Sequence, residues 1–368
     1  MGKMMRAIGL MSGTSMDGVD VALIETDGDS RVERGPAHTF LYDPRFKASL
    51  RGALAAARGL SDRGSRPGIL ADVERDLTAH HASAVSVFLK QHGLQAREID
   101  VVGFHGHTVL HAPERRLTVQ LGDGPGLAAA IGINVVYDLR AADCATGGQG
   151  APLAPVYHRA LAAKLPERPV VVLNVGGVAN VTWIGRGGEL LAFDTGPGNA
   201  MIDDWMQQRR GLPRDEEGAL AAQGRVHDDY VTQYLRHSYF GEPPPKSLDR
   251  NAFGLELVDG LSPEDGAATL TAFTAASIAG ARGHFPDQPQ LWVISGGGRR
   301  NKTLMAMIAE RVESAVAPAE AAGMDGDAVE AEAWAYLAVR SLKGLPITFP
   351  GTTGVPRPLT GGVLAKGA

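Results

Sequence analysis

The chain has 368 residues, of which 44% are hydrophobic and 21% are charged. This length exceeds what one hydrophobic core usually organises, so we expect two domains. The formal net charge of −5 argues against general binding to nucleic acid or to an acidic membrane surface. The single cysteine, Cys144, excludes an internal disulfide and fits a reducing compartment such as the cytoplasm. The first apolar run breaks at Ser12 and Gly13, which is too early for a signal peptide or a membrane span.

Apolar periodicity predicts strands and helices that alternate along the chain. Strands are predicted over residues 7–11, 19–25, 99–104, 133–137, 170–175, 181–184, 190–193 and 291–295. Helices are predicted over residues 69–92, 267–281, 301–312 and 328–341, and loops or irregular segments over 58–67, 242–245 and 345–362. Hairpins within 7–25 and 170–193 each precede helices. This order favours two related α/β domains that face a cleft.

The most informative segment is 191–204, LAFDTGPGNAMIDD, in which a strand-like run leads into a glycine turn and a helix start. Glycines in such a turn let a ligand approach the backbone, and a helix N-terminus offers N–H groups to a phosphate. Asp194, at the predicted strand end, could take a proton from an attacking group or from a water. A plain turn with a solvated carboxylate would show the same pattern.

Three further glycine-rich segments have the residue types of phosphate-binding and nucleotide-binding loops. Segment 12–18, SGTSMDG, can wrap phosphates with N–H and hydroxyl groups, and its Asp17 could hold Mg²⁺. Segment 174–180, NVGGVAN, places paired glycines in a hairpin, and segment 295–301, SGGGRRN, follows a strand and opens a helix. Neither a Walker loop nor a dinucleotide-binding G-x-G-x-x-G is present. Ordinary polar turns or bulges remain the alternative for each segment.

Other segments carry candidate substrate contacts. Residues 105–108, HGHT, follow a strand, and because no further ligand stands at a suitable spacing, a substrate contact is favoured over a metal site, with a purely structural loop as the alternative. Arg140 could bind an anionic substrate through two hydrogen bonds, or pair locally with Asp143. Glu330 and Glu332 lie on a predicted helix, where one of them could face a cleft or both could be solvated.

Taken in chain order, these motifs resemble the anhydro-N-acetylmuramic acid kinase family. The resemblance runs from Gly9 to about Gly362 and covers GLMSGTSMDGVD, HGHT, TVQLGDG, DLRAADCATGGQGAPLAP, LNVGGVANVT, FDTGPGN, PPKS, SGGGRRN and a late TGG. It implies an α/β, two-domain fold of the actin-like and sugar-kinase (RNase H-like) ATPases with a central interdomain cleft. We expect one domain at 1–137 plus 342–368 and the other at 138–341.

The resemblance also implies an activity. Family members use ATP and Mg²⁺ to phosphorylate 1,6-anhydro-N-acetylmuramic acid while water opens the anhydro ring, giving N-acetylmuramic acid 6-phosphate in peptidoglycan recycling. Asp194 corresponds to the general base for that water, and Asp17 is the candidate Mg²⁺ ligand. The protein is then expected to be a cytoplasmic homodimer whose partners are the amino sugar and ATP.

The resemblance carries further roles to matching positions. The implied ATP-binding residues are Gly13, Thr14, Ser15, Met16, Asp17, Gly18, Val19, Asp20, Gly176, Gly177, Asn180, Gly196, Gly198, Asn199, Lys246, Gly296, Gly297, Gly298 and Asn301. The implied substrate-binding residues are His105, Thr108, Gln120, Arg140 and Glu330.

The chain departs from the family pattern at three places. His107 stands where Gln is common, residues 141–142 are alanines where charged residues are common, and Leu248-Asp249-Arg250 replaces Thr-Gly-Arg. These changes bear on fine contacts and not on the reaction class. The alternatives are a kinase for another anhydrosugar such as levoglucosan, a conventional sugar kinase, and an actin-like or chaperone-like ATPase module.

Overall fold

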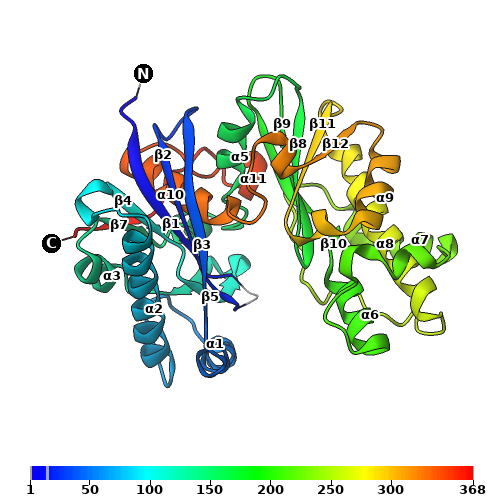
Figure 1. Cartoon of the computed structure of the whole chain (residues 1–368), viewed down its shortest axis with the longest axis horizontal. Coiled ribbons are helices and arrows are strands. Elements are labelled where there is room, and N and C mark those ends of the chain that lie inside the picture. The colour runs from blue at the N-terminus through cyan, green and yellow to red at the C-terminus, as the bar shows by residue number, and fades with distance from the viewer. Residues whose placement is uncertain (1, 14–15, 368) are drawn as a thin grey trace. The chain divides into compact units, whose positions relative to one another are not determined.

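The computed structural model describes residues 2–13 and 16–367, which fold into two compact units (Figure 1). Unit 1 combines the chain up to Ala163 with the stretch from Ala328 onward. Unit 2 is the uninterrupted segment Lys164–Asp327.

Unit 1 is built on a six-stranded mixed sheet with the order β13-β7-β4-β1-β2-β3. Its strands are β1 Met5–Met11, β2 Gly18–Thr26, β3 Val32–Leu41, β4 Val101–Phe104, β7 Val135–Tyr137 and β13 Val363–Ala365. Strands β1, β2 and β3 form an antiparallel meander, and β4 and β7 extend the sheet in parallel with β1. A separate hairpin is formed by β5 His107–Ala112 and β6 Leu117–Leu121.

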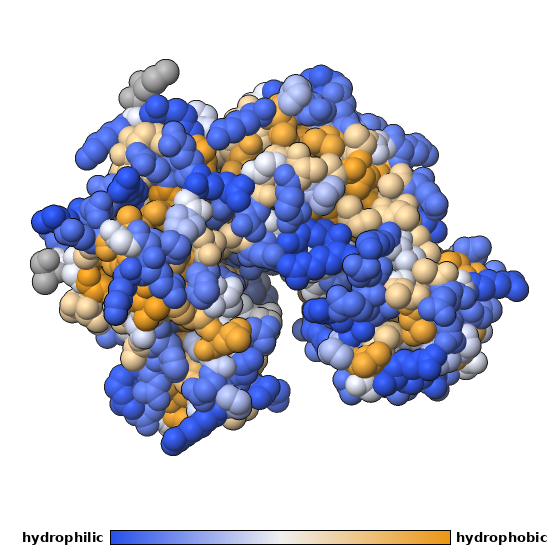
Figure 2. Space-filling view, in the orientation of Figure 1, coloured by the Kyte–Doolittle hydropathy of each residue, from blue (hydrophilic) through white to orange (hydrophobic). Residues whose placement is uncertain are grey.

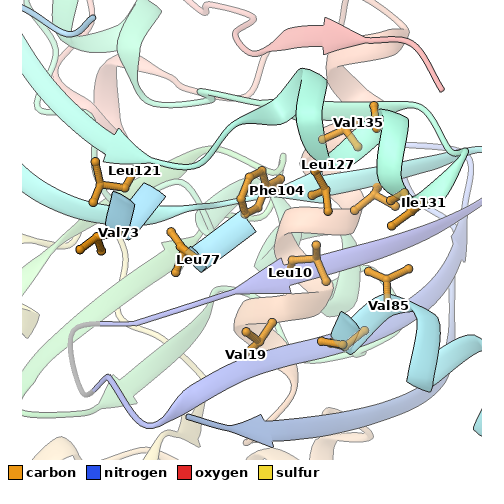
Figure 3. Packing of buried hydrophobic residues seen from close by; sticks show 14 of the residues in the cluster. Leu10, Val19, Val73, Leu77, Val85, Phe104, Leu121, Leu127, Ile131 and Val135 are labelled. Carbon is orange, nitrogen blue, oxygen red and sulfur yellow. The ribbon is translucent and has the colours of Figure 1, made fainter. Parts of the chain in front are cut away.

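Helices cover both faces of this sheet because its central strands are buried on both sides. The helices of unit 1 are α1 Pro44–Ala57, α2 Leu70–Gln91, α3 Gly124–Ile131, α4 Ala141–Ala145, α5 Pro155–Ala162, α10 Val329–Leu342 and α11 Pro350–Thr353. On one face, Figure 3 shows side chains of α2 and α3 packing with Leu10, Val19 and Phe104 of the sheet.

On the other face, α10 lies directly against the strand backbones. A Cβ at Gly9 would lie 1.8 Å from the Ala331 carbonyl oxygen, and one at Gly103 would lie 2.0 Å from the Trp334 carbonyl oxygen. Glycine is therefore required at both positions for the helix to seat. The domain boundaries expected at 137/138 and 341/342 differ from the observed division because α10, together with α4 and α5, packs within unit 1.

Unit 2 repeats the same strand arrangement in a five-stranded sheet with the order β10-β9-β8-β11-β12. Its strands are β8 Val170–Val175, β9 Val178–Ile184, β10 Leu190–Pro197, β11 Leu291–Ser295 and β12 Ala315–Pro318. Again the first three strands form an antiparallel meander, and the last two extend it in parallel with the first. The duplicated order, with helical crossovers between the parallel strands, is the RNase H-like arrangement of actin-like and sugar-kinase domains.

The helices of unit 2 are α6 Ala200–Arg210, α7 Asp228–Leu235, α8 Pro263–Gly280 and α9 Lys302–Val312. Most of α8 is buried, and its residues contribute both to the sheet-side core and to the core shared with α6 and α7. A helix buried all round needs no polar face, which explains its run of alanine and threonine. The predicted start at residue 267 was late because Ser262 caps the helix by accepting a hydrogen bond from the Asp265 N–H at 3.1 Å.

The predicted strands and helices are confirmed in type, with ends that differ by a few residues. Strand β3 was not predicted because most of its side chains are exposed, so no apolar pattern marks it. Hydrophobic residues on the faces visible in Figure 2 are interspersed among hydrophilic ones. Among the described residues, no helix has the length and apolar character needed to cross a membrane.

Candidate active site

Asp194 lies on β10 at an irregularity where the pairing with β9 shifts between Asp194 and Gly196. The strand was expected to end at this carboxylate, and that expectation was wrong. Gly196 and Pro197 continue the strand because β9 begins early enough to pair with them, at Val178. Asp194 thus stands at a register shift within a strand, where a local kink of the backbone re-aims a side chain.

The segment 239–248 holds the Asp194 backbone and carboxylate. The Leu248 N–H donates to Asp194 Oδ2 at 2.8 Å, and the Asp194 N–H donates to the Lys246 carbonyl at 3.0 Å. The Tyr239 hydroxyl donates to the Asp194 carbonyl oxygen at 2.5 Å. Burial raises the pKa of Asp194 to about 6, against the opposing effect of the Leu248 N–H. A carboxylate with a pKa this close to neutrality is suited to general-base chemistry.

The same segment explains why the departure at Leu248 is tolerated. Leu248 contacts Asp194 through its backbone N–H, so the side chain at this position is free to differ from threonine. Lys246 is held locally: its Nζ donates to the Tyr239 carbonyl at 2.9 Å and lies 4.5 Å from the centre of the Tyr239 ring. Burial lowers the pKa of Lys246.

The paired glycines Gly176 and Gly177 form the β8–β9 turn itself and not a bulge within a strand. The Gly176 carbonyl accepts from the Asn199 N–H at 2.8 Å, and the Gly177 carbonyl accepts from Gly198 and Ala200 at 2.9 and 3.2 Å. These backbone donors were expected to be unpaired at the start of α6. Instead they join the helix start to the turn.

The sheet register also places Asn180 beside Asp194. On β9, Asn180 is paired with Asp194 on one side and with Asn174 on the other. The two predicted binding segments of this hairpin therefore meet at the proposed base.

The glycines of unit 2 divide into two groups by the space around them. At Gly176, Gly177 and Gly297, a Cβ would meet no atom closer than 3.6 Å, so packing does not require glycine. At Gly196, Gly198, Gly296 and Gly298, a Cβ would lie 2.3–2.6 Å from its nearest neighbour, so packing does require it. Gly296 also has a φ of +74°, which L side chains rarely adopt. The first group is where a ligand could approach the backbone.

A pocket of about 180 Å³ in unit 2 gathers three of the predicted ATP-binding residues, Asn199, Gly297 and Asn301. It is lined in addition by Ile202, Asp203, Arg214, Asp215, Glu216, Glu217 and Arg300. Asn301 caps α9 by accepting from the Leu304 N–H at 2.9 Å, and Asn199 Nδ2 donates to the Val175 carbonyl at 3.0 Å. Both amides are thus fixed by the ends of secondary-structure elements.

In unit 1, the predicted phosphate loop joins β1 to β2. Thr14 and Ser15 of that prediction lie outside the described residues. The Met16 N–H donates to the Gly13 carbonyl at 3.1 Å, while Gly18, Val19 and Asp20 belong to β2. A Cβ at Gly13 would meet no atom closer than 3.7 Å, whereas one at Gly18 would lie 2.3 Å from the β3 backbone.

Asp17 is the predicted Mg²⁺ ligand of this loop. Its carboxylate is exposed and forms an ion pair with Lys47 Nζ at 3.2 Å. Among the described residues, no group of three or more His, Cys, Asp or Glu side chains converges as a metal site. Since Mg²⁺ typically takes only one or two protein carboxylates together with phosphate oxygens and water, a single exposed carboxylate is compatible with it.

Four predicted substrate-binding residues of unit 1 form two hydrogen-bonded pairs. Gln120 Nε2 donates to Thr108 Oγ1 at 3.2 Å, and Arg140 Nε donates to His105 Nε2 at 3.4 Å. His105 and Gln120 line a pocket of about 360 Å³. The other lining residues are Arg63, Gly64, Arg66, Phe104, Gly106, Thr118, Val119, Leu121, Gly122, Tyr137 and Asp138.

The local Arg140–Asp143 ion pair that was the alternative for this arginine is not formed. Asp143 accepts from the Gly150 N–H and the Thr353 hydroxyl, both at 2.6 Å. Arg140 donates to the Gly150 carbonyl at 2.8 Å, and no ion pair of the described residues includes it. Burial lowers the pKa of Arg140 to about 10. Its positive charge therefore has no bonded carboxylate in this part of the chain.

The two glutamates of α10 differ sharply. Glu332 is buried and accepts from Arg34 at 2.8 Å and from the Tyr157 hydroxyl at 2.7 Å, so its role is structural. The Glu330 residue is exposed, although desolvation of its carboxyl group and the charge of Asp20 raise its pKa, while Arg140 opposes the shift. Of the pair, Glu330 is the one available to a ligand.

His107, which replaces the common glutamine, is buried and bonded within unit 1. Its Nδ1 lies 3.3 Å from Ser12 Oγ, which accepts a hydrogen bond from the Tyr42 hydroxyl at 3.0 Å. The departure at this position thus places the ring beneath the start of the 12–18 loop.

Several site residues were missed from the sequence. The Leu248 contact uses a backbone N–H, which no side-chain pattern reveals. Arg63 and Arg66 stand in a polar segment that was predicted only as a surface loop, and Asp203 was part of a helix start without an assigned role.

Comparison with known proteins places these observations in a family. The family model described as "Anhydro-N-acetylmuramic acid kinase" matches residues 5–366. The chain belongs to the anhydro-N-acetylmuramic acid kinase family. Among its curated relatives, the anhydro-N-acetylmuramic acid kinase of Rhodospirillum rubrum is 55% identical over 97% of this chain and 93% of its own. That of Bradyrhizobium diazoefficiens is 53% identical over 99% of this chain and 100% of its own.

A solved structure, component A of the (R)-2-hydroxyglutaryl-CoA dehydratase of Acidaminococcus fermentans, is 12% identical. The alignment covers 92% of this chain and 99% of that structure's chain, with a TM-score of 0.48.

Membership in the anhydro-N-acetylmuramic acid kinase family makes this chain a kinase.

Proposed function

We propose that the protein transfers the γ-phosphoryl group of ATP to 1,6-anhydro-N-acetylmuramic acid while water opens the anhydro ring, giving N-acetylmuramic acid 6-phosphate. The observation that carries the proposal is Asp194. It is a carboxylate fixed by a backbone N–H, with a pKa raised to about 6, in a chain more than half identical to kinases named for this substrate.

The chemistry assigns one proton transfer to Asp194. A water attacks the anomeric carbon and gives a proton to the carboxylate, and the bond from that carbon to the bridging oxygen breaks. The released oxygen takes the γ-phosphoryl group, and ADP leaves. Because an acetal oxygen is a poor nucleophile until its anomeric bond breaks, ring opening and phosphoryl transfer are coupled in this proposal. A positioned base contributes ~10²–10⁴-fold to such a rate.

The remaining residues bind the two substrates. The open backbone at Gly13, Gly176, Gly177 and Gly297 suits close approach of phosphates and nucleotide. Mg²⁺, which Asp17 would help to hold, neutralises charge that develops on the transferring phosphoryl group. Asn180, Lys246 and the pocket residues Asn199 and Asn301 complete the proposed nucleotide contacts.

We assign the sugar to the unit 1 residues His105, Thr108, Gln120, Arg140 and Glu330. Arg140 has no bonded carboxylate among the described residues, so we assign it the lactyl carboxylate of the sugar. We further propose that the protein works in the cytoplasm as a homodimer.

The test is mass spectrometry of products after incubation with ATP, Mg²⁺ and the anhydro sugar in ¹⁸O-water. Wild type should yield a phosphorylated, ring-opened sugar with ¹⁸O at the anomeric carbon. Asp194→Asn should lose this product, while Asp229→Asn, which changes an exposed carboxylate of the same unit, should keep it. Phosphorylation without ¹⁸O incorporation would refute the role of water. ATP consumption without any phosphorylated anhydro-sugar product would refute the substrate.

A further inference from the structure

The 180 Å³ pocket of unit 2 contains one carboxylate, Asp203, that accepts no hydrogen bond from the described residues. Asp203 lies in the first turn of α6 and is half-buried. Among the residues that the structure describes, none donates a hydrogen bond to its carboxylate. A half-buried carboxylate keeps part of its hydration, so a ligand that displaces this water has to supply hydrogen-bond donors in its place.

The other charged side chains that line this pocket already have partners. Arg214 pairs with Glu216 at 2.7 Å, Arg300 with Asp327 at 2.6 Å, and Glu217 with Lys302 at 2.6 Å. The Asp215 carboxylate accepts from the N–H groups of Leu220 and Ala221 at 2.8 and 2.9 Å. Among the described lining residues, Asp203 is therefore the carboxylate whose oxygens accept no hydrogen bond from the protein and can accept one from a ligand.

Among the described residues, Asp203 forms no ion pair with the cations around it, since Arg214 is bonded to Glu216. Arg250, a nearby positive charge, is bonded to Asp204 at 2.9 Å. Burial and the adjacent Asp204 charge raise the pKa of Asp203 to about 6, so the carboxylate is still mostly ionised at pH 7.5 and hydrogen-bond donors stabilise it. A pair of hydroxyl groups can satisfy both oxygens of a carboxylate, as ribose hydroxyls do at dinucleotide-binding folds.

The pocket size agrees with part of a nucleotide. Its volume of about 180 Å³ is below the roughly 300–1,000 Å³ of sites that enclose a whole ligand. Its wall also contains Asn199, Gly297 and Asn301, for which a role in binding ATP is proposed above.

We infer that Asp203 accepts hydrogen bonds from the ribose hydroxyl groups of the nucleotide and so determines the preference for ribonucleotides over deoxyribonucleotides. This inference rests on the proposed use of ATP, and it assigns to that site a specificity-determining residue. The proposed contact uses the 2′ and 3′ hydroxyls of the ribose, so a nucleotide that lacks one of them loses a hydrogen bond that its base and phosphates do not supply.

The test is calorimetric titration of the full chain with ADP, 2′-deoxy-ADP and 3′-deoxy-ADP, without sugar. Wild type should bind ADP about tenfold or more tightly than at least one deoxy analogue, as expected for a hydrogen bond to a charged acceptor. Asp203→Ala should bind all three within about threefold of one another. Asp204→Asn, which alters the exposed neighbouring carboxylate, should keep the wild-type preference. Unchanged urea midpoints would show that the variants are folded.

The outcomes separate this inference from the proposed function. Equal binding of the three nucleotides by wild type, or an unchanged preference in Asp203→Ala, overturns the role of Asp203 even if the sugar is phosphorylated. A ribose preference that depends on Asp203, in a protein that does not phosphorylate the anhydro sugar, supports the inference and refutes the proposed substrate. Failure of wild type to bind any of the three nucleotides overturns both.

Discussion

Replacing Asp194 with asparagine should remove activity and, at neutral pH, increase stability. The asparagine side chain has the same shape and can still accept a hydrogen bond from the Leu248 N–H, so the fold around it is kept. It cannot take a proton from water. We therefore expect turnover to fall by ~10²–10⁴-fold.

The stability change follows from the pKa of Asp194. In the folded protein this pKa is raised from 3.8 to about 6, so folding is penalised only when the carboxylate is charged. The penalty is absent below the unfolded pKa, grows as the pH rises between the two values, and is complete above the folded pKa. A shift of about two units corresponds to at most ~3 kcal/mol. Asparagine carries no such penalty, so the variant should gain up to this amount at pH 7.5 and nothing at pH 4.

Urea unfolding followed by tryptophan fluorescence measures this difference. Three of the four tryptophans, Trp183, Trp205 and Trp292, are buried in unit 2, so most of the signal reports on the unit that contains Asp194. An equal stability difference between variant and wild type at pH 4 and pH 7.5 would refute the reasoning.

Wild-type turnover should also fall about tenfold from pH 7 to pH 5, as the fraction of ionised base falls around a pKa of about 6. A flat profile over that range would refute the assignment of the base.

Three further substitutions test other parts of the structure. Gly297→Ala should fold normally but weaken ADP binding at least ~10-fold because its methyl group fills the pocket, whereas Gly298→Ala should be destabilised by ~1–3 kcal/mol because its methyl group clashes with Val175. Calorimetric titration and urea unfolding measure the two effects, and equal results for the two variants would contradict the division of these glycines. Gly103→Ala should destabilise unit 1 by more than ~3 kcal/mol because its Cβ would overlap the α10 backbone, and a urea midpoint like that of wild type would show that the helix can move away. Arg140→Lys should lower kcat/KM for the anhydro sugar by ~10–100-fold and leave KM for ATP nearly unchanged, since lysine lacks the two-pronged geometry; a larger effect on ATP would move Arg140 to the nucleotide.

Element types were predictable because apolar spacing records which faces are buried. The hairpins of both sheets, the long helix α2 and the two glycine-rich segments of unit 2 all follow from local sequence. Strand β3 did not, because an exposed edge strand has no apolar alternation to detect. The division of the chain was also beyond local reasoning, since the place of α10 depends on its contact with glycines more than 200 residues earlier.

The candidate site was predictable where a side chain carries the chemistry. The resemblance singled out Asp194, but its altered pKa arises from burial and from the N–H of a residue 54 positions later. Glu330 and Glu332 could not be ranked from the sequence, because only the tertiary structure pairs Glu332 with Arg34 and Tyr157. The role of each glycine likewise depends on atoms that the sequence places far away, as at Gly18 and the β3 backbone.

The seating of α10 on the first sheet has a consequence for biosynthesis. Although most of unit 1 is translated first, its sheet lacks one covering helix until residues 329–342 have left the ribosome. Unit 2 is continuous and is complete by Asp327, so it can fold while the earlier strands still await their last partner. On a translating ribosome, the second unit along the chain is therefore the first to be complete, and one face of the N-terminal sheet stays uncovered until α10 has emerged.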